Sequence, residues 1–288
     1  MFRRSKELDA PGREALVRVV ASPQFELIPL KNVQAQSLFL PAGATVTVTA
    51  SPTKRIEATV ELSARLSERG FRAIPHLAAR MIHNRAHLRS LLASLDAAGI
   101  EQAFVVGGDA EEPGDYPDGL ALLRAMADLG HRLTEIGIPC YPQGHPTIPD
   151  DRLLAALAEK QPLATSMTTQ LCFDAGAIQA WLLARRDAGI SLPVTLGIPG
   201  VAELHRLIEI SARIGVRDSR RFLSRNTALV GRILRPGGYR PDGLLAALAP
   251  LLVDPVANVQ GLHLYTFNQV ETTEEWRQAY LAGLAATG

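Results

Sequence analysis

Residues 45–75, TVTVTASPTKRIEATVELSARLSERGFRAIP, contain one complete repeating unit of the predicted fold. Its first five residues, Thr45–Thr49, are β-branched and favour a strand. Lys54–Gly70 follows with apolar residues at helical spacing and a terminal glycine, which together predict an amphipathic helix with a C-terminal stop. A second β-rich run, Phe71–Pro75, comes next. The stretch therefore predicts a strand, a helix and another strand.

The same alternation runs along the chain. Eight β-rich runs occur, at Gln24–Ile28, Thr45–Thr49, Phe71–Pro75, Gln102–Gly107, Gly137–Tyr141, Ala164–Gln170, Pro193–Ile198 and Gly261–Thr266. Further helical stretches are Asn84–Ala98, Gly119–Ile136, Asp151–Glu159, Ala175–Ala188 and Thr272–Ala285. Alternating strands and helices imply a parallel sheet, and eight units predict a closed (β/α)₈ TIM barrel. An open doubly wound sheet is the alternative fold.

The domain organisation is predicted to be a single catalytic barrel over residues 1–288. Residues 1–23 are expected to form a helical extension. The connection between the seventh and eighth strands is longer than the others, and it is interpreted as a helical insertion over residues 200–256 rather than a second domain. Its helical segments are Val201–Gly215, Ser219–Arg232 and Asp242–Leu252.

Composition limits the function classes. The chain has 288 residues, 47% of them hydrophobic, and a formal net charge of +1, so no global field attracts nucleic acid or a membrane surface. Cys140 and Cys172 lie in different segments, which favours a reducing cytoplasm. The N-terminal stretch has no secretory h-region, and the longest nearly apolar run, Leu244–Val253, is too short to span a bilayer. Homo-oligomer formation is left open.

Candidate chemistry lies where the strands end, because TIM barrels carry their active sites at the C-terminal ends of the strands. The polar residues there form an enzyme-like set: Glu26, Thr49, His76, Asp109, Tyr141, His145, Gln170, Tyr265 and Asn268. Each also has a structural interpretation. Glu26 could form a salt bridge, Asp109 a turn or helix cap, His76 a core hydrogen bond, and Tyr141 with His145 a rigid turn. The other histidines are interpreted as structural: His83, His87, His131, His205 and His263.

Standard catalytic fingerprints are missing from the sequence. It contains no HExxH or clustered His/Cys ligands for a metal, no GxGxxG, no GxxxxGK[ST] and no GxSxG. The remaining chemistry is general acid–base and electrostatic catalysis inside a barrel.

Several motifs resemble those of the methylenetetrahydrofolate reductase family, in order and each on its expected strand. FELIPLK at Phe25–Lys31 resembles the FEFFPP-type motif, and Tyr141–Pro146 resembles YPxxHP. The other matches are Thr45–Thr49, Pro75–Leu77, Gly107–Asp109, Thr169–Asp174, Gly197–Pro199 and Leu264–Asn268. The resemblance covers nearly the whole chain from about residue 24.

This resemblance implies the reduction of 5,10-methylenetetrahydrofolate to 5-methyltetrahydrofolate with hydride from NAD(P)H. It assigns Glu26 as the general acid and Asp109 as the electrostatic stabiliser of the developing cation. A carboxyl group within an apolar strand favours the neutral form that an acid needs. Gln170 would bind the pterin and Phe173 would stack on the ligand, with Tyr265 and Asn268 also in substrate binding. Residues matching FAD contacts are Thr49, His76, Tyr141, His145, Asp151 and Lys160.

The sequence also departs from the family pattern. Gly107 replaces an arginine, and acidic residues follow Asp109 at Glu111, Glu112, Asp115 and Asp118. The segment between His145 and Gln170 is shortened. These changes predict that FAD, if used, is held weakly or is absent. Three alternative functions stay open: the same chemistry run oxidatively in a demethylation pathway, a non-catalytic folate-binding paralogue, and a pterin-barrel methyltransferase.

Overall fold

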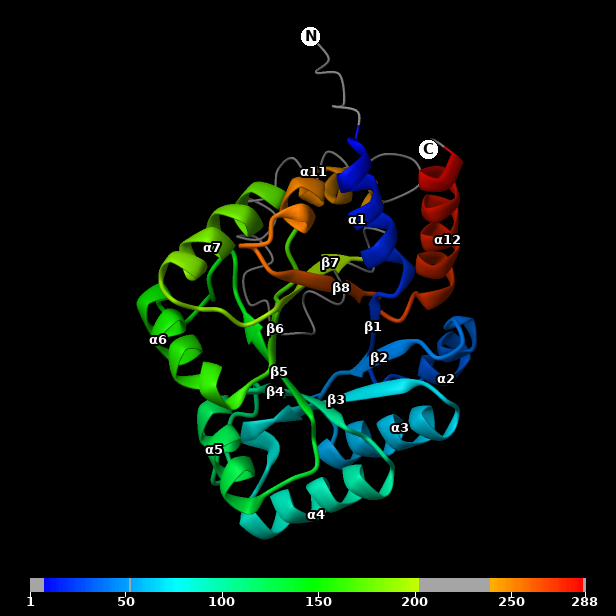
Figure 1. The fold of residues 1–288 in the computed structure, drawn as a ribbon. Coiled ribbons are helices and arrows are strands. Elements are labelled where there is room, and N and C mark those ends of the chain that lie inside the picture. The colour runs from blue at the N-terminus through cyan, green and yellow to red at the C-terminus, as the bar shows by residue number, and fades with distance from the viewer. Residues whose placement is uncertain (1–7, 52, 202–238, 287–288) are drawn as a thin grey trace.

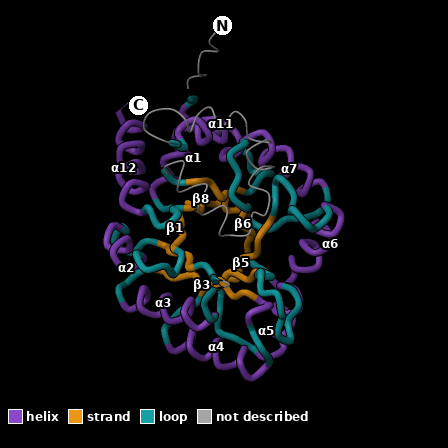
Figure 2. The backbone as a smooth tube through the Cα atoms, turned by 180° about the vertical axis from the view of Figure 1, so that it is seen from behind, coloured by secondary structure: helices purple, strands orange, loops and turns teal. Residues whose placement is uncertain are grey.

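The computed structural model describes residues 8–51, 53–201 and 239–286. Its centre is a closed barrel of eight parallel strands in sequence order (Figure 2). The strands are β1 (Gln24–Leu27), β2 (Thr45–Val48), β3 (Arg72–Ala78), β4 (Gln102–Val106), β5 (Glu135–Cys140), β6 (Ser166–Thr169), β7 (Val194–Pro199) and β8 (Val259–Tyr265). The closed order confirms the predicted TIM barrel and excludes the open sheet.

Helices surround this barrel (Figures 1 and 2). They are α1 (Ala10–Ala21), α2 (Val33–Gln36), α3 (Ile56–Glu68), α4 (Arg85–Ala97), α5 (Gly119–Leu129), α6 (Asp150–Lys160), α7 (Ala175–Asp187), α11 (Asp242–Val253) and α12 (Val270–Ala286). Three short 3₁₀ turns are η1 (Ser37–Phe39), η2 (Ala79–Met81) and η3 (Gln161–Leu163). Helix α3 buries the apolar stripe that its sequence spacing predicts, including Ile56, Val60 and Leu66. None of the described helices is long and apolar enough to cross a membrane.

One helix prediction was wrong at its C-terminal end. The stretch Gly119–Ile136 was expected to be helical throughout, but α5 ends at Leu129. Gly130 follows with φ 73°, a left-handed conformation that glycine adopts readily, and its N–H bonds back to the carbonyls of Met126 and Ala127. The next residues cross to β5, which begins at Glu135.

Helix α1 lies between α11 and α12 in the outer ring (Figure 1). The Asp9 side chain caps its first turn by accepting from the N–H of Gly12. The predicted extension over residues 1–23 therefore contains a helix that packs against the barrel's outer layer. Of the predicted insertion, α11 is described. The segment expected at 219–232, and all of the segment expected at 201–215 after its first residue, lie outside the described residues.

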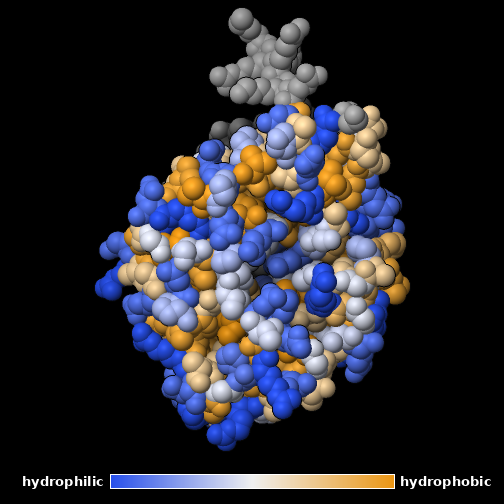
Figure 3. Space-filling model, viewed as in Figure 1, coloured by the Kyte–Doolittle hydropathy of each residue, from blue (hydrophilic) through white to orange (hydrophobic). Residues whose placement is uncertain are grey.

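Strand register decides which side chains enter the barrel. Gln24 pairs with Thr45 and Glu26 with Thr47 in the parallel β1–β2 ladder. Side chains alternate along a strand, so Phe25 and Leu27 pack into the large hydrophobic core while Gln24 and Glu26 take the opposite, interior face. The outer surface seen in Figure 3 intersperses hydrophilic and hydrophobic residues.

Candidate functional site

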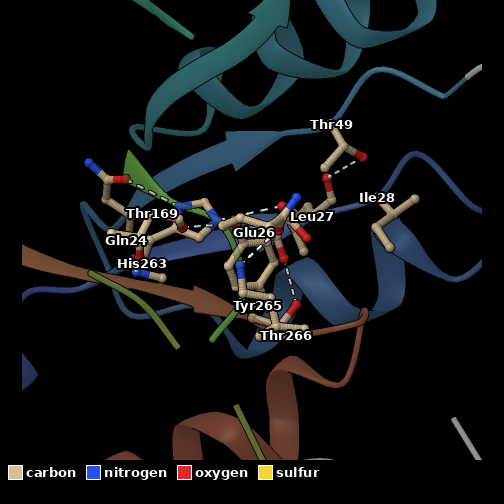
Figure 4. Close-up of polar contacts among 12 residues, drawn as sticks. Gln24, Glu26, Leu27, Ile28, Thr49, Thr169, His263, Tyr265 and Thr266 are labelled. Carbon is tan, nitrogen blue, oxygen red and sulfur yellow. Dashed lines mark hydrogen bonds and ion pairs between the residues drawn. The ribbon is translucent and has the colours of Figure 1, made fainter. Parts of the chain in front are cut away.

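The centre of the candidate site is Glu26, a residue that is only 6% exposed. Its Oε2 lies 3.5 Å from Nε2 of His263, on the adjoining strand β8. The other ring nitrogen of His263, Nδ1, lies 3.3 Å from Oε1 of Gln24. Figure 4 shows the three side chains in a row, joined by dashed lines. A buried carboxyl group therefore faces an imidazole rather than a permanent cation.

The backbone around Glu26 is held by the end of β8. The hydroxyl of Thr266 donates a short hydrogen bond to the carbonyl of Glu26 (Figure 4). Two residues on, the side-chain amide of Asn268 pairs with the backbone of Ile28. These bonds fix the position of β1, and hence of the Glu26 side chain, relative to β8.

A second buried histidine, His76 on β3, packs its ring 4.8 Å from that of Phe104. Burial, with a smaller contribution from His263, lowers the pKa of His76 to about 3. Its imidazole is therefore neutral at physiological pH. Within the described residues, its Nε2 has no hydrogen-bond partner. His76 was predicted to contact the cofactor, and its position in the barrel leaves that a prediction.

The ring of Tyr265 stands edge-on to His263, with centroids 4.6 Å apart. Its hydroxyl donates to the carbonyl of Thr169 at 3.3 Å, and burial, followed by the nearby Glu26 carboxylate, raises the pKa of Tyr265 well above its usual value. A side chain at Gly197 would collide with the Tyr265 ring and with the Thr169 carbonyl. The glycine of the motif Gly197–Pro199 on strand 7 is therefore required by close packing.

Asp109, Tyr141 and His145 gather at the ends of β4 and β5. The rings of Tyr141 and His145 meet edge-on at 5.2 Å. Burial raises the pKa of Tyr141 to about 12, with Cys140 and Asp109 adding to the effect. Burial lowers the pKa of His145, while Asp109 opposes that shift. The exposed Asp109 carboxylate therefore lies close enough to influence both rings.

The loop after β4 is pinned by Arg80. Its backbone N–H donates to Gly107, and its guanidinium donates to the carbonyls of Ala110 at 2.7 Å and Glu111 at 2.8 Å. A side chain at Gly114 would collide with the backbone at Ile82. The loop is therefore held tightly against the segment after β3, and the guanidinium is engaged by carbonyls.

Two of the predicted FAD contacts lie on α6, where they are well separated. Asp151 is exposed in the first turn and Lys160 is the last residue, about 13 Å along the helix axis. Burial lowers the pKa of Lys160, opposed by Asp118. The Lys160 side chain lines a cavity of about 30 Å³ with Tyr141 and Trp181. That cavity has room for a water molecule, not for a nucleotide group.

These positions test the fit of FAD. Thr49 follows β2, and Tyr141 and His145 follow β5, so all three lie at the C-terminal ends of their strands. Their hydroxyl, phenol and imidazole groups are of the kind that can hydrogen-bond a flavin ring. The donor set is poorer for a diphosphate, because Gly107 supplies no cation and Arg80 directs its Nε and Nη2 to the carbonyls of Ala110 and Glu111.

The remaining predicted substrate residues are placed as follows. Gln170 is exposed after β6, and its side-chain oxygen accepts from the N–H of Leu171. Phe173 packs edge-on against Tyr239, 5.2 Å between centroids, in a small apolar cluster with Ile28 and Phe267. Asn268 is 2% exposed, and its amide bonds Ile28 and Asn32. Their roles toward a ligand stay predictions.

Sequence reasoning missed two residues of the Glu26 cluster. His263 was interpreted as structural, and Gln24 was not considered. A usable signal was present: Gln24 precedes Glu26 by two residues, and His263 precedes Tyr265 by two, so each pair shares one strand face.

Comparisons with known proteins agree with this architecture. Residues 29–232, more than half of the chain, match the family model for methylenetetrahydrofolate reductase. An uncharacterized protein from Clostridium thermocellum that binds two copies of 5-methyl-5,6,7,8-tetrahydrofolic acid superposes with a TM-score of 0.60 and 10% identity, over 94% of this chain and 98% of that one. A putative lyase/mutase from Burkholderia cenocepacia J2315 gives 0.46 and 14% identity, over 96% and 87%. On the family match, the chain belongs to the methylenetetrahydrofolate reductase family.

Proposed function

We propose that this protein interconverts 5,10-methylenetetrahydrofolate and 5-methyltetrahydrofolate by hydride transfer with NAD(P)H, with Glu26 as general acid. The observation that carries the proposal is the buried Glu26 carboxyl group on the interior face of β1, whose Oε2 lies 3.5 Å from Nε2 of His263. An acid in such a place is kept from bulk water until a substrate enters.

The proton step follows from this placement. Glu26 gives its proton to a ring nitrogen of the folate, and the adjoining carbon–nitrogen bond breaks with its electron pair moving to that nitrogen. The remaining nitrogen donates its lone pair, which leaves an iminium cation. Hydride from the nicotinamide adds to the iminium carbon and completes the methyl group. Water then reprotonates the Glu26 carboxylate.

The other site residues bind the folate or stabilise the positive charge that develops on it. Asp109 stabilises the iminium cation electrostatically. Gln170 hydrogen-bonds the pterin, and Phe173 offers an aromatic edge within the apolar cluster at the mouth. Tyr265 and Asn268 complete the substrate side, Tyr265 through its ring and Asn268 by holding β8 against β1. No step of this scheme is routed through a flavin.

The loop after β4 bears on how strongly the diphosphate of FAD could be held. The pinned loop after β4 carries exposed Glu111 and Glu112, and the Arg80 guanidinium directs its Nε and Nη2 to the carbonyls of that loop. FAD, if used, is therefore held more weakly than in typical family members, and direct hydride transfer from the nicotinamide fits the site. Losing one charge-assisted contact costs about 1.5–3 kcal/mol, roughly ten- to a hundredfold in affinity.

The test is dialysis followed by a visible spectrum and an assay of NADH or NADPH oxidation with methylenetetrahydrofolate, with and without added FAD. A colourless protein with full activity and sequential kinetics supports direct transfer. A protein that retains one flavin per chain, with ping-pong kinetics, overturns weak flavin binding. Absence of nicotinamide oxidation under every condition overturns the reductase itself.

Non-catalytic folate binding is a second candidate, and the folate-binding Clostridium thermocellum protein favours it. It predicts tight binding of methylenetetrahydrofolate with no nicotinamide oxidation. The oxidative direction uses the same site and is measured with 5-methyltetrahydrofolate and NAD(P)⁺. Both cysteines are free and buried, which supports a reducing, cytoplasmic setting for any of these activities.

A further inference from the structure

We propose that Gln24 and His263 are a positioning pair that keeps Glu26 in its proton-carrying form. This inference rests on the proposed function, and it concerns how the acid is made ready rather than the reaction it serves. Neither residue is needed to touch the folate for this role.

The His263 ring lies between the side chains of Gln24 and Glu26. The two ring nitrogens of His263 face different partners: Nδ1 faces Oε1 of Gln24 at 3.3 Å, and Nε2 faces Oε2 of Glu26 at 3.5 Å. The side chains of His263 and Glu26 are 4% and 8% exposed. Solvent therefore contributes little to the choice of proton position at either nitrogen.

Gln24 selects the tautomer of His263. A side-chain carbonyl can only accept a hydrogen bond, so Gln24 Oε1 requires the proton of the neutral imidazole to be on Nδ1. Nε2 is then a buried lone-pair acceptor with no hydrogen-bond partner among the described residues, and Glu26 Oε2 lies 3.5 Å from it. Such an acceptor favours Glu26 with a proton on Oε2 and disfavours the bare carboxylate. Gln24 thereby acts on Glu26 through His263.

The groups facing this cluster are Tyr265 beside His263 on β8, and His76 across the interior on β3. His76 is neutral above about pH 3, because burial lowers its pKa. Among the described residues, no Lys or Arg nitrogen lies within ion-pair distance of the Glu26 carboxylate.

The first test needs no activity. Protein labelled with ¹⁵N at histidine is measured by NMR, and His263→Gln identifies the His263 signals. We expect a protonated Nδ1 and an unprotonated Nε2 in the wild type, and a mixture of tautomers in Gln24→Met, which keeps the length of the side chain but removes the acceptor. A wild-type His263 protonated on Nε2 overturns the inference.

The second test is the pH profile of turnover. In Gln24→Met the imidazole is free to carry its proton on Nε2 and donate it to a Glu26 carboxylate. We expect the alkaline fall of kcat to begin about one pH unit lower, a tenfold change in protonation, with KM for the folate little changed. His83→Gln, an exposed histidine, is the matched control and should keep the wild-type profile. An unshifted profile in Gln24→Met overturns the pair's role.

The two tests separate the inference from the function. A wild type without nicotinamide oxidation defeats the proposed reductase, while the NMR signals still decide the tautomer. A wild type with full activity but a protonated Nε2 leaves the reductase standing and defeats the positioning pair.

Discussion

The side-chain amide of Asn268 pairs with both backbone groups of Ile28, its Oδ1 accepting from the N–H at 2.8 Å and its Nδ2 donating to the carbonyl at 2.8 Å. The amide therefore makes the pair of hydrogen bonds to Ile28 that the backbone of a neighbouring strand would make. Only two register pairs join these strands, Gln24 with His263 and Phe25 with Leu264. The amide extends the contact from the barrel wall to the mouth, one residue beyond the end of β1.

Asn268→Ala should destabilise the protein by roughly 1–3 kcal/mol, because the buried N–H of Ile28 loses its partner, while the Ile28 carbonyl still accepts from the N–H of Leu30. Asn258→Ala is the matched control. Asn258 has φ 51° against 54° for Asn268, but its amide makes one partly exposed bond to Ser191. Urea unfolding of the two variants measures the difference. Equal losses would show that backbone strain, not the amide pairing, sets the effect.

A buried ion pair anchors the N-terminal helix. The Arg277 guanidinium binds both carboxylate oxygens of Glu274, at 2.6 and 2.7 Å, and donates to the carbonyls of Val20 and Ala21 at the end of α1. Arg277→Met should cost about 3–5 kcal/mol, since the Glu274 carboxylate is left buried without its cation.

The control for this prediction is the exposed pair of Arg124 and Glu159. Arg124→Met should change the free energy of unfolding by about 0–1 kcal/mol. Hydrogen exchange gives a second readout, because α1 amides should exchange faster in Arg277→Met and not in Arg124→Met. Unchanged α1 exchange in both variants would contradict the anchoring role.

Most of the barrel could be predicted because each strand is a short β-rich run bounded by turn residues. The eight predicted runs overlap the eight strands, with ends displaced by a few residues. The helix error at Gly130 has a local cause. Leu133 and Ile136 continue an apolar spacing that resembles a helix, and the sequence does not reveal that Gly130 takes φ 73°.

The site was predicted only in part. Glu26 stood out as a carboxylate within an apolar strand, whereas His263 is an ordinary residue in the middle of a strand. Their contact depends on β8 pairing with β1, with Gln24 in register with His263. Barrel closure sets that register across 239 residues of chain, and no local pattern encodes it.

His76 should make stability depend on pH. Its pKa is about 3 in the folded protein and 6.5 when unperturbed. Between these values the unfolded chain binds a proton here that the folded chain does not, so stability is full above about pH 6.5 and is lost as pH falls. From pH 7.5 to pH 5 the loss should be on the order of 1–2 kcal/mol.

His76→Gln removes the titrating group, so its unfolding free energy should fall less over this range than that of the wild type. Chemical denaturation at several pH values measures both slopes. His83→Gln should follow the wild type, since His83 is exposed. A wild-type slope in His76→Gln would mean that other groups account for the pH dependence.

Arg80 should control the order of the loop that carries Asp109. Arg80→Met removes the bonds to the carbonyls of Ala110 and Glu111. We expect amide exchange at Gly114 and Asp115 to accelerate about tenfold, the equivalent of roughly one hydrogen bond. Turnover of Arg80→Met should fall as the loop becomes less ordered, because the Asp109 carboxylate is then less well placed. Arg55→Met, at an exposed pair with Glu57, should leave exchange in the loop unchanged.

Glu26→Gln is the most direct test of the proposed acid. The amide has the shape of the carboxyl group, and its nitrogen can donate to Nε2 of His263 in place of the acid proton, so the fold should be kept. It has no proton to give to the folate nitrogen. We expect kcat to fall by about 10² to 10⁴, with folate still bound. Stopped assays of nicotinamide oxidation and equilibrium folate binding separate the two effects. Glu61→Gln, on the exposed face of α3, should retain full turnover. Near-normal turnover in Glu26→Gln would show that another group opens the folate ring.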